Sequence, residues 1–292
     1  MKSSNSPYLS YVDSIKELYN RAKQLDHQIK QPATGTPNPV TKANEGPSIL
    51  LFSPHPDDEC ITGLLPLRLA QEKRARITNV AVTLGSLAER REERWDELQI
   101  ACQHLNFQCH RLDLKDIVKI AQPNNSAWKD TIQSIQNLFT IYKPDGIFCP
   151  HPKDAHPTHQ AVYQLILESI RLFPSFTDPL NLFYTEYWST MEKPNLMIEA
   201  SNAHLAELIY SLSCHRGEVN RNPYHLTLPA WMMDNTRRGS ELLSKPGASH
   251  PDLCFSTLYK WQIIKNGTFC QPSSKMLKIN TYCTEKSLEE LF

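Results

Sequence analysis

The sequence carries no excess of either charge, because 31 lysine and arginine residues balance 31 aspartate and glutamate residues. This balance gives no electrostatic reason to expect a nucleic acid or an anionic membrane as the main partner. No apolar run approaches the roughly 20 residues that span a bilayer, and the polar stretch Met1–Pro7 lacks the apolar core of a secretory signal. We therefore expect a cytoplasmic protein without a membrane span.

The eight cysteines include no CxxC pair, and they are scattered along the chain, so no thiolate metal site is predicted. Several lie in apolar contexts, as Cys102 and Cys149 do, which is typical of small buried thiols in a reducing compartment. Internal repeats and long low-complexity tracts are also missing. With 292 residues, the chain can form one large domain with a substantial core.

An amphipathic helix is predicted over residues 8–29, where apolar side chains recur at spacings of three and four. A polar, proline-rich connector follows at residues 31–39. We expect residues 1–46 to form a helical arm that precedes a single catalytic domain over residues 47–292. The arm could pack back on that domain or meet a partner, and the second outcome would suit a homo-oligomer.

From residue 48 onward, predicted strands and helices alternate. The predicted strands cover residues 48–53, 77–84, 108–112, 146–149 and 181–188, and the predicted helices cover 63–73, 89–105, 128–142, 158–172 and 203–214. This alternation predicts an α/β fold with a Rossmann-like, mostly parallel sheet flanked by helices. Residues 240–292 are less regular, and an edge strand is expected there only over 255–264.

The most informative segment is His55-Pro56-Asp57-Asp58-Glu59, directly after the predicted buried strand over 48–53. A strand-to-helix turn with a capping aspartate would explain the proline and one carboxylate. It would not explain a histidine followed by adjacent carboxylates, a cluster of like charge that is costly unless a cation neutralises it. Strand ends are where open α/β sheets place their chemistry.

A second cluster follows the predicted strand over 146–149, with His151, Asp154, His156 and His159 within nine residues. A polar loop in which Thr158 caps the next helix is the alternative interpretation. Together the two segments supply enough nitrogen and oxygen ligands for a divalent metal with an open coordination position. This combination favours a metal-dependent hydrolase.

The segment from about residue 48 to 215 resembles the PIG-L/LmbE-like family of zinc-dependent de-N-acetylases. Residues 54–59 match the family's (A/P)-H-P-D-D-E motif in full. Residues 151–159 match its H-P-x-D-x-H-x-D-H pattern, except that Thr158 stands where the family often has aspartate. Residues 94–105 are similar to its R-x-x-E-x-x-x-A-x-x-x-L helix.

The resemblance implies that zinc is bound by His55, Asp58 and His159, and Fe²⁺ would suit the same ligands. It implies that Asp57 is the general base and that His156 stabilises the oxyanion or protonates the leaving amine.

Four further assignments concern the substrate. The resemblance implies that Arg94 contacts sugar hydroxyls, although a charged helical face also explains this arginine. His215, Arg237 and Arg238 lie in polar and aromatic segments similar to those of some longer deacetylase-type proteins. That similarity implies that they line the mouth of the site and recognise phosphate or sugar oxygens. An ordinary surface of a C-terminal helix is the alternative.

The expected function is a zinc-dependent hydrolase that removes the acetyl group from an N-acetylglucosamine-type sugar or sugar conjugate. A metal phosphoesterase would need further carboxylates for a second metal. The alternative from outside enzymology is a non-catalytic member of the fold that binds a sugar or metabolite. The presence of Asp57 and His156 favours the enzyme.

Overall fold

The structure, a computed structural model, describes residues 7–26, 46–174, 176, 179–244, 247, 249–279 and 291. The chain divides into two compact units, residues 1–41 and 42–292. In the first unit, α1 (Pro7–Asp26) confirms the described part of the predicted N-terminal helix, whereas the predicted connector over 31–39 lies outside the described residues. Among the described helices, none has the length and apolar character needed to cross a membrane.

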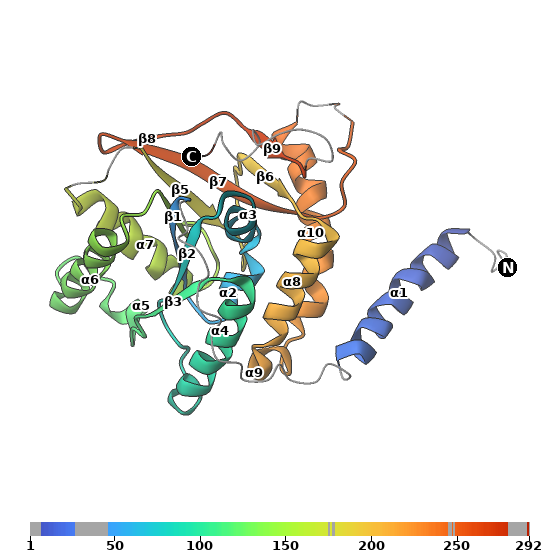
Figure 1. The fold of residues 1–292 in the computed structure, drawn as a ribbon, viewed down its shortest axis with the longest axis horizontal. Coiled ribbons are helices and arrows are strands. Elements are labelled where there is room, and N and C mark those ends of the chain that lie inside the picture. The colour runs from blue at the N-terminus through green and yellow to red at the C-terminus, as the bar shows by residue number, and fades with distance from the viewer. Residues whose placement is uncertain are drawn as a thin grey trace. The chain divides into compact units, whose positions relative to one another are not determined.

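The larger unit is built on a sheet with the strand order β3-β2-β1-β4-β5-β7-β6-β9 (Figure 1). Its first five strands pair in parallel, which confirms the Rossmann-like, mostly parallel sheet. These strands are β1 (Ser48–Ser53), β2 (Arg76–Ala81), β3 (Gln108–Arg111), β4 (Gly146–Pro150) and β5 (Leu180–Thr185). Every residue of β1, β4 and β5 is buried, as expected for strands covered on both faces.

The strand predicted over 255–264 exists as β7 (Ser256–Lys265), but it is not an edge strand. It runs antiparallel between β5 and β6 (Leu196–Glu199), and β8 (Thr268–Cys270) also pairs with it. Beyond β6, β9 (Lys275–Leu277) completes the sheet. The side chain of Asn195, just before β6, explains part of this placement. It bonds the backbone of Trp261 in both directions, at 2.6 and 2.9 Å.

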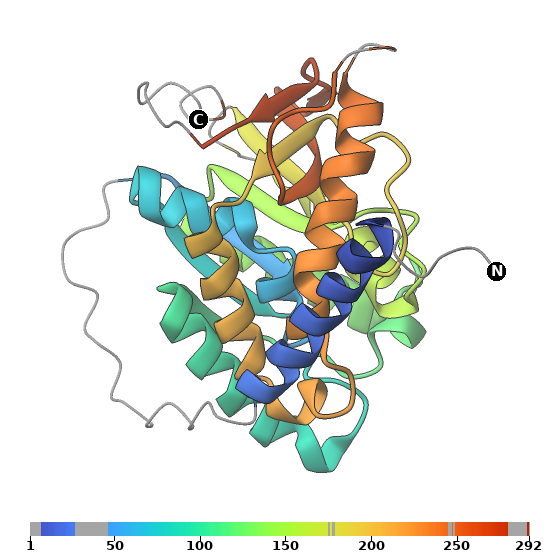
Figure 2. The same cartoon turned by 90° about the vertical axis from the view of Figure 1, so that its right-hand side faces the viewer.

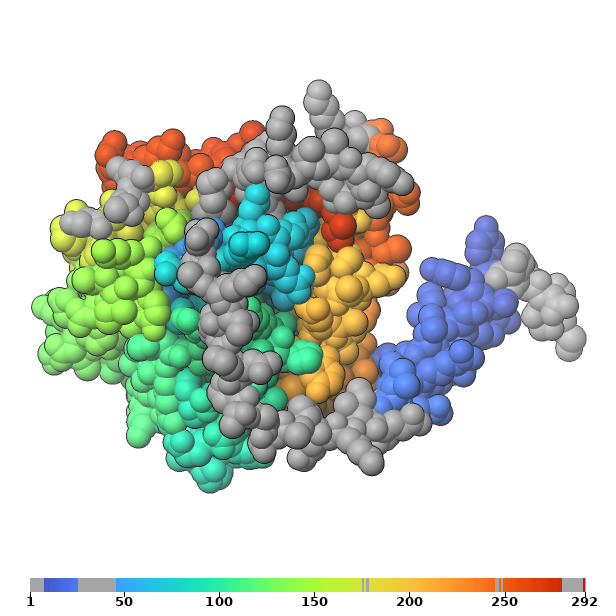
Figure 3. Space-filling view, in the orientation of Figure 1, coloured from blue at the N-terminus to red at the C-terminus, as the bar shows by residue number. Residues whose placement is uncertain are grey.

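Helices cover both faces of the sheet (Figures 1 and 2). One face carries α2 (Asp58–Ile61), α3 (Leu64–Lys73), α4 (Arg91–Leu105), α8 (Asn202–Ser213) and α10 (Tyr224–Leu243), and the other carries α5 (Ile117–Ile120), α6 (Ser126–Tyr142) and α7 (Pro157–Leu172). The short η1 (Ala88–Arg90) and α9 (Arg216–Val219) precede α4 and α10. In the space-filling view, α6 and α7 form a green flank of the larger unit and α8 an orange one (Figure 3).

Two hydrophobic clusters lie on opposite faces of the sheet, and β1 contributes to both. Ile49 and Leu51 pack into the cluster under α3, α4 and α8, and Leu50 and Phe52 into the cluster under α6 and α7. This alternation follows from the twofold side-chain period of a strand. It explains why the apolar run before His55 forms the centre of the sheet.

The strand order reverses between β1 and β4, which are neighbours in the sheet although the chain forms β2 and β3 between them. Open α/β sheets bind their ligands in the crevice at such a reversal, outside the carboxyl ends of the strands. The segments that follow β1 and β4 contain His55 and His156, respectively. The topology therefore brings the two predicted site segments to one edge of the sheet.

Candidate active site

The three predicted metal ligands, His55, Asp58 and His159, meet at this edge. Asp58 Oδ2 lies 3.6 Å from His55 Nδ1 and 3.4 Å from His159 Nε2, and the two nitrogens are 3.3 Å apart. Ligand atoms held at about 2.0–2.2 Å around a tetrahedral ion are about 3.3–3.6 Å from one another. The three atoms therefore have the spacing of one face of a metal coordination shell.

The environment of Asp58 also fits a cation. The residue is 3 % exposed, and its Oδ1 has no hydrogen-bond partner among the described residues. Burial raises the pKa of Asp58, but the charges of His159 and His55 outweigh this effect and hold it below the ordinary value. A buried carboxylate oxygen without a partner is costly, and a bound metal would remove that cost.

Asp154 orients His159. Its Oδ2 lies 3.2 Å from His159 Nδ1, while its Oδ1 accepts the backbone N–H of His156 at 2.8 Å. Burial lowers the pKa of His159, but Asp58 and Asp154 together raise it above the ordinary value. A carboxylate on one ring nitrogen fixes the tautomer that presents the other to a metal. The sequence placed Asp154 within a motif but indicated no role for it.

Asp57 lines the cavity beside these groups in an unusual backbone conformation. Its φ of 113° lies in the left-handed region, which typically costs a residue other than glycine about 1–3 kcal/mol. It precedes α2 as the N-cap, yet its side chain makes no capping hydrogen bond, so the carboxylate is not used to stabilise that helix end. Burial, followed by the charge of Asp58, raises the pKa of Asp57 well above the ordinary value. A raised pKa suits a group that must take up a proton.

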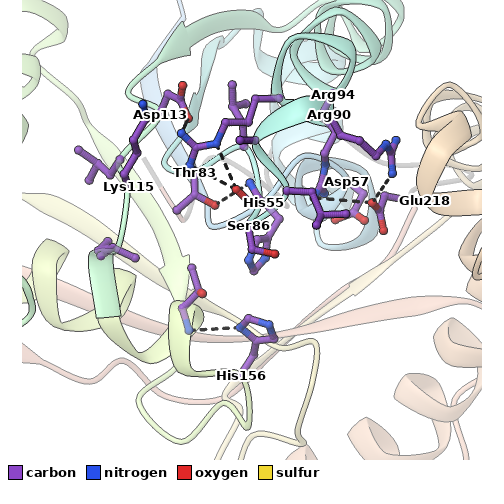
Figure 4. Close-up of a pocket in the computed structure, with 18 of the residues that line it drawn as sticks. His55, Asp57, Thr83, Ser86, Arg90, Arg94, Asp113, Lys115, His156 and Glu218 are labelled. Carbon is purple, nitrogen blue, oxygen red and sulfur yellow. Dashed lines mark hydrogen bonds and ion pairs between the residues drawn. The ribbon is translucent and has the colours of Figure 1, made fainter. Parts of the chain in front are cut away.

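His156 faces the same cavity from the N-cap of α7 (Figure 4). Its Nδ1 accepts the backbone N–H of Thr158 at 3.2 Å, so the proton of the neutral ring lies on Nε2. Burial lowers the pKa of His156, and the neighbouring His55 and His159 lower it further. The ring is therefore a neutral hydrogen-bond donor at neutral pH. Nitrogens of these three histidines lie within 4.8 Å of one another.

A cavity of about 1090 Å³ opens over these side chains, with Arg94 and Glu218 toward one side and Asp113 and Lys115 toward the other (Figure 4). Its walls come from stretches far apart in the sequence. They include parts of residues 83–94 and 111–119, together with Thr158, Tyr187, Trp188, Glu218, Arg221, Asn222 and Tyr224.

Arg94 lines the cavity, but the protein already uses much of its guanidinium. Nη2 donates to the carbonyl oxygen of Pro56 at 2.9 Å, and Nη1 lies 3.6 Å from Glu218 Oε1. Nε has no hydrogen-bond partner among the described residues. Arg94 therefore braces the turn that carries Asp57.

His215 does not lie at the mouth of the site, so that expectation is wrong. It is fully buried and absent from the cavity lining, and its Nε2 lies 2.6 Å from Oε1 of Glu59, which is also fully buried. The many polar and aromatic residues around position 215 give no sign that the turn between α8 and α9 is buried against the segment that follows β1.

Arg237 and Arg238 are also outside the cavity lining, which corrects their predicted position. Arg237 pairs with Asp234 and Glu241 on the exposed face of its own helix. Arg238 pairs with Glu186, at the end of β5, and thereby anchors the loop that carries Tyr187 and Trp188.

That loop contains cavity residues that the sequence did not reveal. The predicted strand over 181–188 ends at Thr185, and Tyr187 and Trp188 turn toward the site. The rings of Tyr187 and His159 lie 6.2 Å apart, and those of Trp188 and His156 lie 5.7 Å apart. Neither residue belongs to a motif, so no local sequence signal could have identified it.

Comparisons with known proteins agree with this geometry. Residues 50–170 match the family model described as PIG-L, GlcNAc-PI de-N-acetylase. The uncharacterized deacetylase YaiS of Escherichia coli K12 is 32% identical over 147 residues, which cover 46% of this chain and 74% of that protein.

Solved structures share the fold at low sequence identity, and two of them serve as examples. N,N'-diacetylchitobiose deacetylase from Pyrococcus horikoshii has a TM-score of 0.55 and 14% identity, over 89% of this chain and 94% of that one. GalB from Pseudomonas putida KT2440, a 4-carboxy-2-hydroxymuconate hydratase, has a TM-score of 0.58 and 14% identity, over 74% and 95%. Because a deacetylase and a hydratase share this architecture, the fold alone does not determine the reaction.

Proposed function

This chain belongs to the PIG-L family of de-N-acetylases, and we propose that it removes the acetyl group from an N-acetylglucosamine-type sugar or sugar conjugate with the help of a divalent metal. One observation carries the proposal. The side chains of His55, Asp58 and His159 converge at metal-ligand spacing, and the unligated carboxylate of Asp57 lines the adjoining cavity.

His55, Asp58 and His159 would hold the ion. Two imidazoles and one carboxylate are a donor set of catalytic zinc sites, and they leave positions open for water and substrate. Fe²⁺ accepts the same donors. A divalent ion bound there would supply a Lewis acid to the acetamide carbonyl and would lower the pKa of water toward about 7.

The protein's own groups would move the protons. Asp57 takes a proton from the attacking water, a role that its raised pKa favours. The negative charge that develops on the former carbonyl oxygen receives a hydrogen bond from Nε2–H of His156. As the C–N bond breaks, Asp57 returns its proton to the nitrogen. The amine then leaves neutral, and the acetyl group leaves as acetic acid, which releases its proton to solvent and becomes acetate.

The size and lining of the cavity support a conjugate larger than a single sugar ring. Its volume of about 1090 Å³ lies just above the roughly 300–1,000 Å³ typical of sites for drug-sized ligands. Trp188, which is 48% exposed beside His156, offers an aromatic face to a sugar ring. Arg94, on the wall opposite Trp188, would contact hydroxyl groups of the sugar.

The test combines metal analysis of the purified protein with acetate release from N-acetylglucosamine and a panel of its conjugates. We expect one divalent ion per chain and acetate release that a chelator abolishes. Metal binding without acetate from any member of the panel would contradict the proposal and would favour a sugar-binding protein without catalysis.

A further inference from the structure

Glu59 and His215 form a buried pair beneath the turn that carries Asp57, and the proposed reaction uses neither. They are 156 residues apart in the sequence, both are 0% exposed, and His215 Nε2 lies 2.6 Å from Glu59 Oε1. The thiol of Cys60 donates to the same oxygen at 3.2 Å. Removing such a pair from water costs about as much free energy as the attraction between its members returns. A gain in folding stability therefore does not by itself account for the presence of the pair.

The second oxygen of Glu59 connects this pair to the catalytic turn. Oε2 accepts the backbone N–H of Asp57 at 3.0 Å. Asp57 is held at a φ of 113°, and a residue other than glycine keeps such a conformation only where its surroundings impose it. Glu59 therefore contacts the peptide whose orientation directs the Asp57 carboxylate into the cavity.

His215 connects the same turn to a neighbouring segment of the cavity wall. It directly precedes α9, and Glu218 of that helix lines the cavity. The backbone of Gly217, in the same helix, is also held in place, because its N–H donates to Glu97 Oε1 at 2.9 Å. The pair thus links two segments that must keep their relative positions around a substrate.

We propose that Glu59 and His215 are positioning residues for Asp57, with Glu59 holding the Asp57 peptide and His215 holding Glu59. This assignment rests on the proposed function, in which Asp57 is the general base. Ligand atoms of Glu59, Cys60 and His215 lie within 4.8 Å of one another, but the hydrogen bonds to Glu59 already account for this cluster without an ion. Neither proposed residue lines the cavity, so neither would touch the substrate.

The experiment compares two substitutions of similar volume at Glu59. Glu59→Met removes the acceptor of the Asp57 N–H, whereas Glu59→Gln keeps an amide oxygen for it. We expect Glu59→Met to lower kcat by about 100-fold, the order of loss that a displacement near 1 Å causes. Glu59→Gln should recover most of that loss. KM and metal content should stay within about twofold of the wild type in both variants.

Amide hydrogen exchange gives a readout that does not depend on turnover. We expect the Asp57 N–H to exchange slowly in the wild type and in Glu59→Gln, and faster in Glu59→Met. Equal exchange and equal kcat in the two variants would overturn the proposal. If the wild type released no acetate from any substrate, the same exchange pattern would still support positioning while the proposed reaction failed.

His215 provides the second pair of variants, should Glu59→Met lose its cooperative melting transition. His215→Leu removes the donor to Glu59 and should lower kcat about tenfold, whereas His215→Gln keeps a donor and should stay near the wild type. Equal activity in these two variants would also overturn the proposal. Glu168→Gln is the control, because Glu168 bonds the indole of Trp128 away from the site and should leave every readout unchanged.

Discussion

Replacing Asp57 with asparagine separates proton transfer from metal binding. Asparagine has nearly the same size and tolerates left-handed backbone conformations, so the turn should keep its shape. The backbone N–H that Glu59 accepts is unchanged by the substitution. Asp57 contributes no atom to the group formed by His55, Asp58 and His159, so the variant should bind metal as the wild type does.

The size of the expected loss follows from the role of a general base. Such a group contributes about 10²–10⁴-fold to the rate. Since each factor of ten corresponds to about 1.4 kcal/mol, Asp57→Asn should raise the activation barrier by about 3–5 kcal/mol. KM should change little, because the side chain acts on the water and not on the sugar.

Although Asp57→Asn should lose activity, it should gain folding stability in the metal-free protein. Burial and the charge of Asp58 raise the pKa of Asp57 above its ordinary value of 3.8. In the metal-free protein this carboxyl therefore favours the folded state at low pH, and that contribution is lost as the pH rises through the raised pKa. Asparagine does not titrate. Metal-free Asp57→Asn should thus be more stable than the wild type at pH 7, with the advantage shrinking toward pH 4.

Three measurements check this reasoning: metal per chain, kcat with KM, and thermal melting of the metal-free protein between pH 4 and 7. The control is Asp58→Asn, which should lose metal and activity together. A variant Asp57→Asn that turns over at near the wild-type rate would refute the base assignment. One that has lost its metal would show that Asp57 is a ligand.

Other predictions concern the metal and its support. His159→Ala should lose the ion, as elemental analysis would show, because it removes one of three converging ligands. Asp154→Asn should weaken metal affinity by about 10–100-fold, because the substitution removes the carboxylate that lies beside His159 Nδ1. Competition with a chelator would measure this loss. Removing the metal should abolish acetate release, and zinc or ferrous ion should restore it. Finally, kcat/KM should fall on the acid side, because a general base must be deprotonated to act, and Asp57→Asn should lack the part of that fall that comes from Asp57.

The sequence predicted that side chains after β1 and β4 would lie close together, because the two motifs are short and directly follow strands. The order of strands and helices placed the turn after β1 beside the turn after β4, through the general behaviour of parallel sheets. The ends of the predicted strands and helices of this region differ from the observed ones by at most three residues. Asp57, Asp58 and His159 could therefore be located together without coordinates.

Contacts between distant segments were not predictable in the same way. The polar residues around His215 and Arg238 looked like a binding surface, yet one is fully buried and the other anchors a loop. Polarity alone does not tell whether a side chain faces solvent, a substrate or a buried partner. The prediction that 255–264 forms an edge strand was wrong for a similar reason. β6, which pairs with its outer side, and β9, which pairs with β6, are too short to leave a clear pattern in the sequence.

The residues that line the cavity come from two successive parts of the chain. This division bears on how substrate preference can change between relatives. Every group proposed to act on the acetamide lies within residues 50–170, the part that matches the family model. Tyr187, Trp188, Glu218 and Tyr224, which also line the cavity, all follow it. The groups proposed to act on the acetamide thus lie in the earlier stretch, whereas the cavity walls come from both stretches. Chimeras that exchange only the later stretch between relatives should show altered substrate preferences while they keep the groups proposed to act on the acetamide.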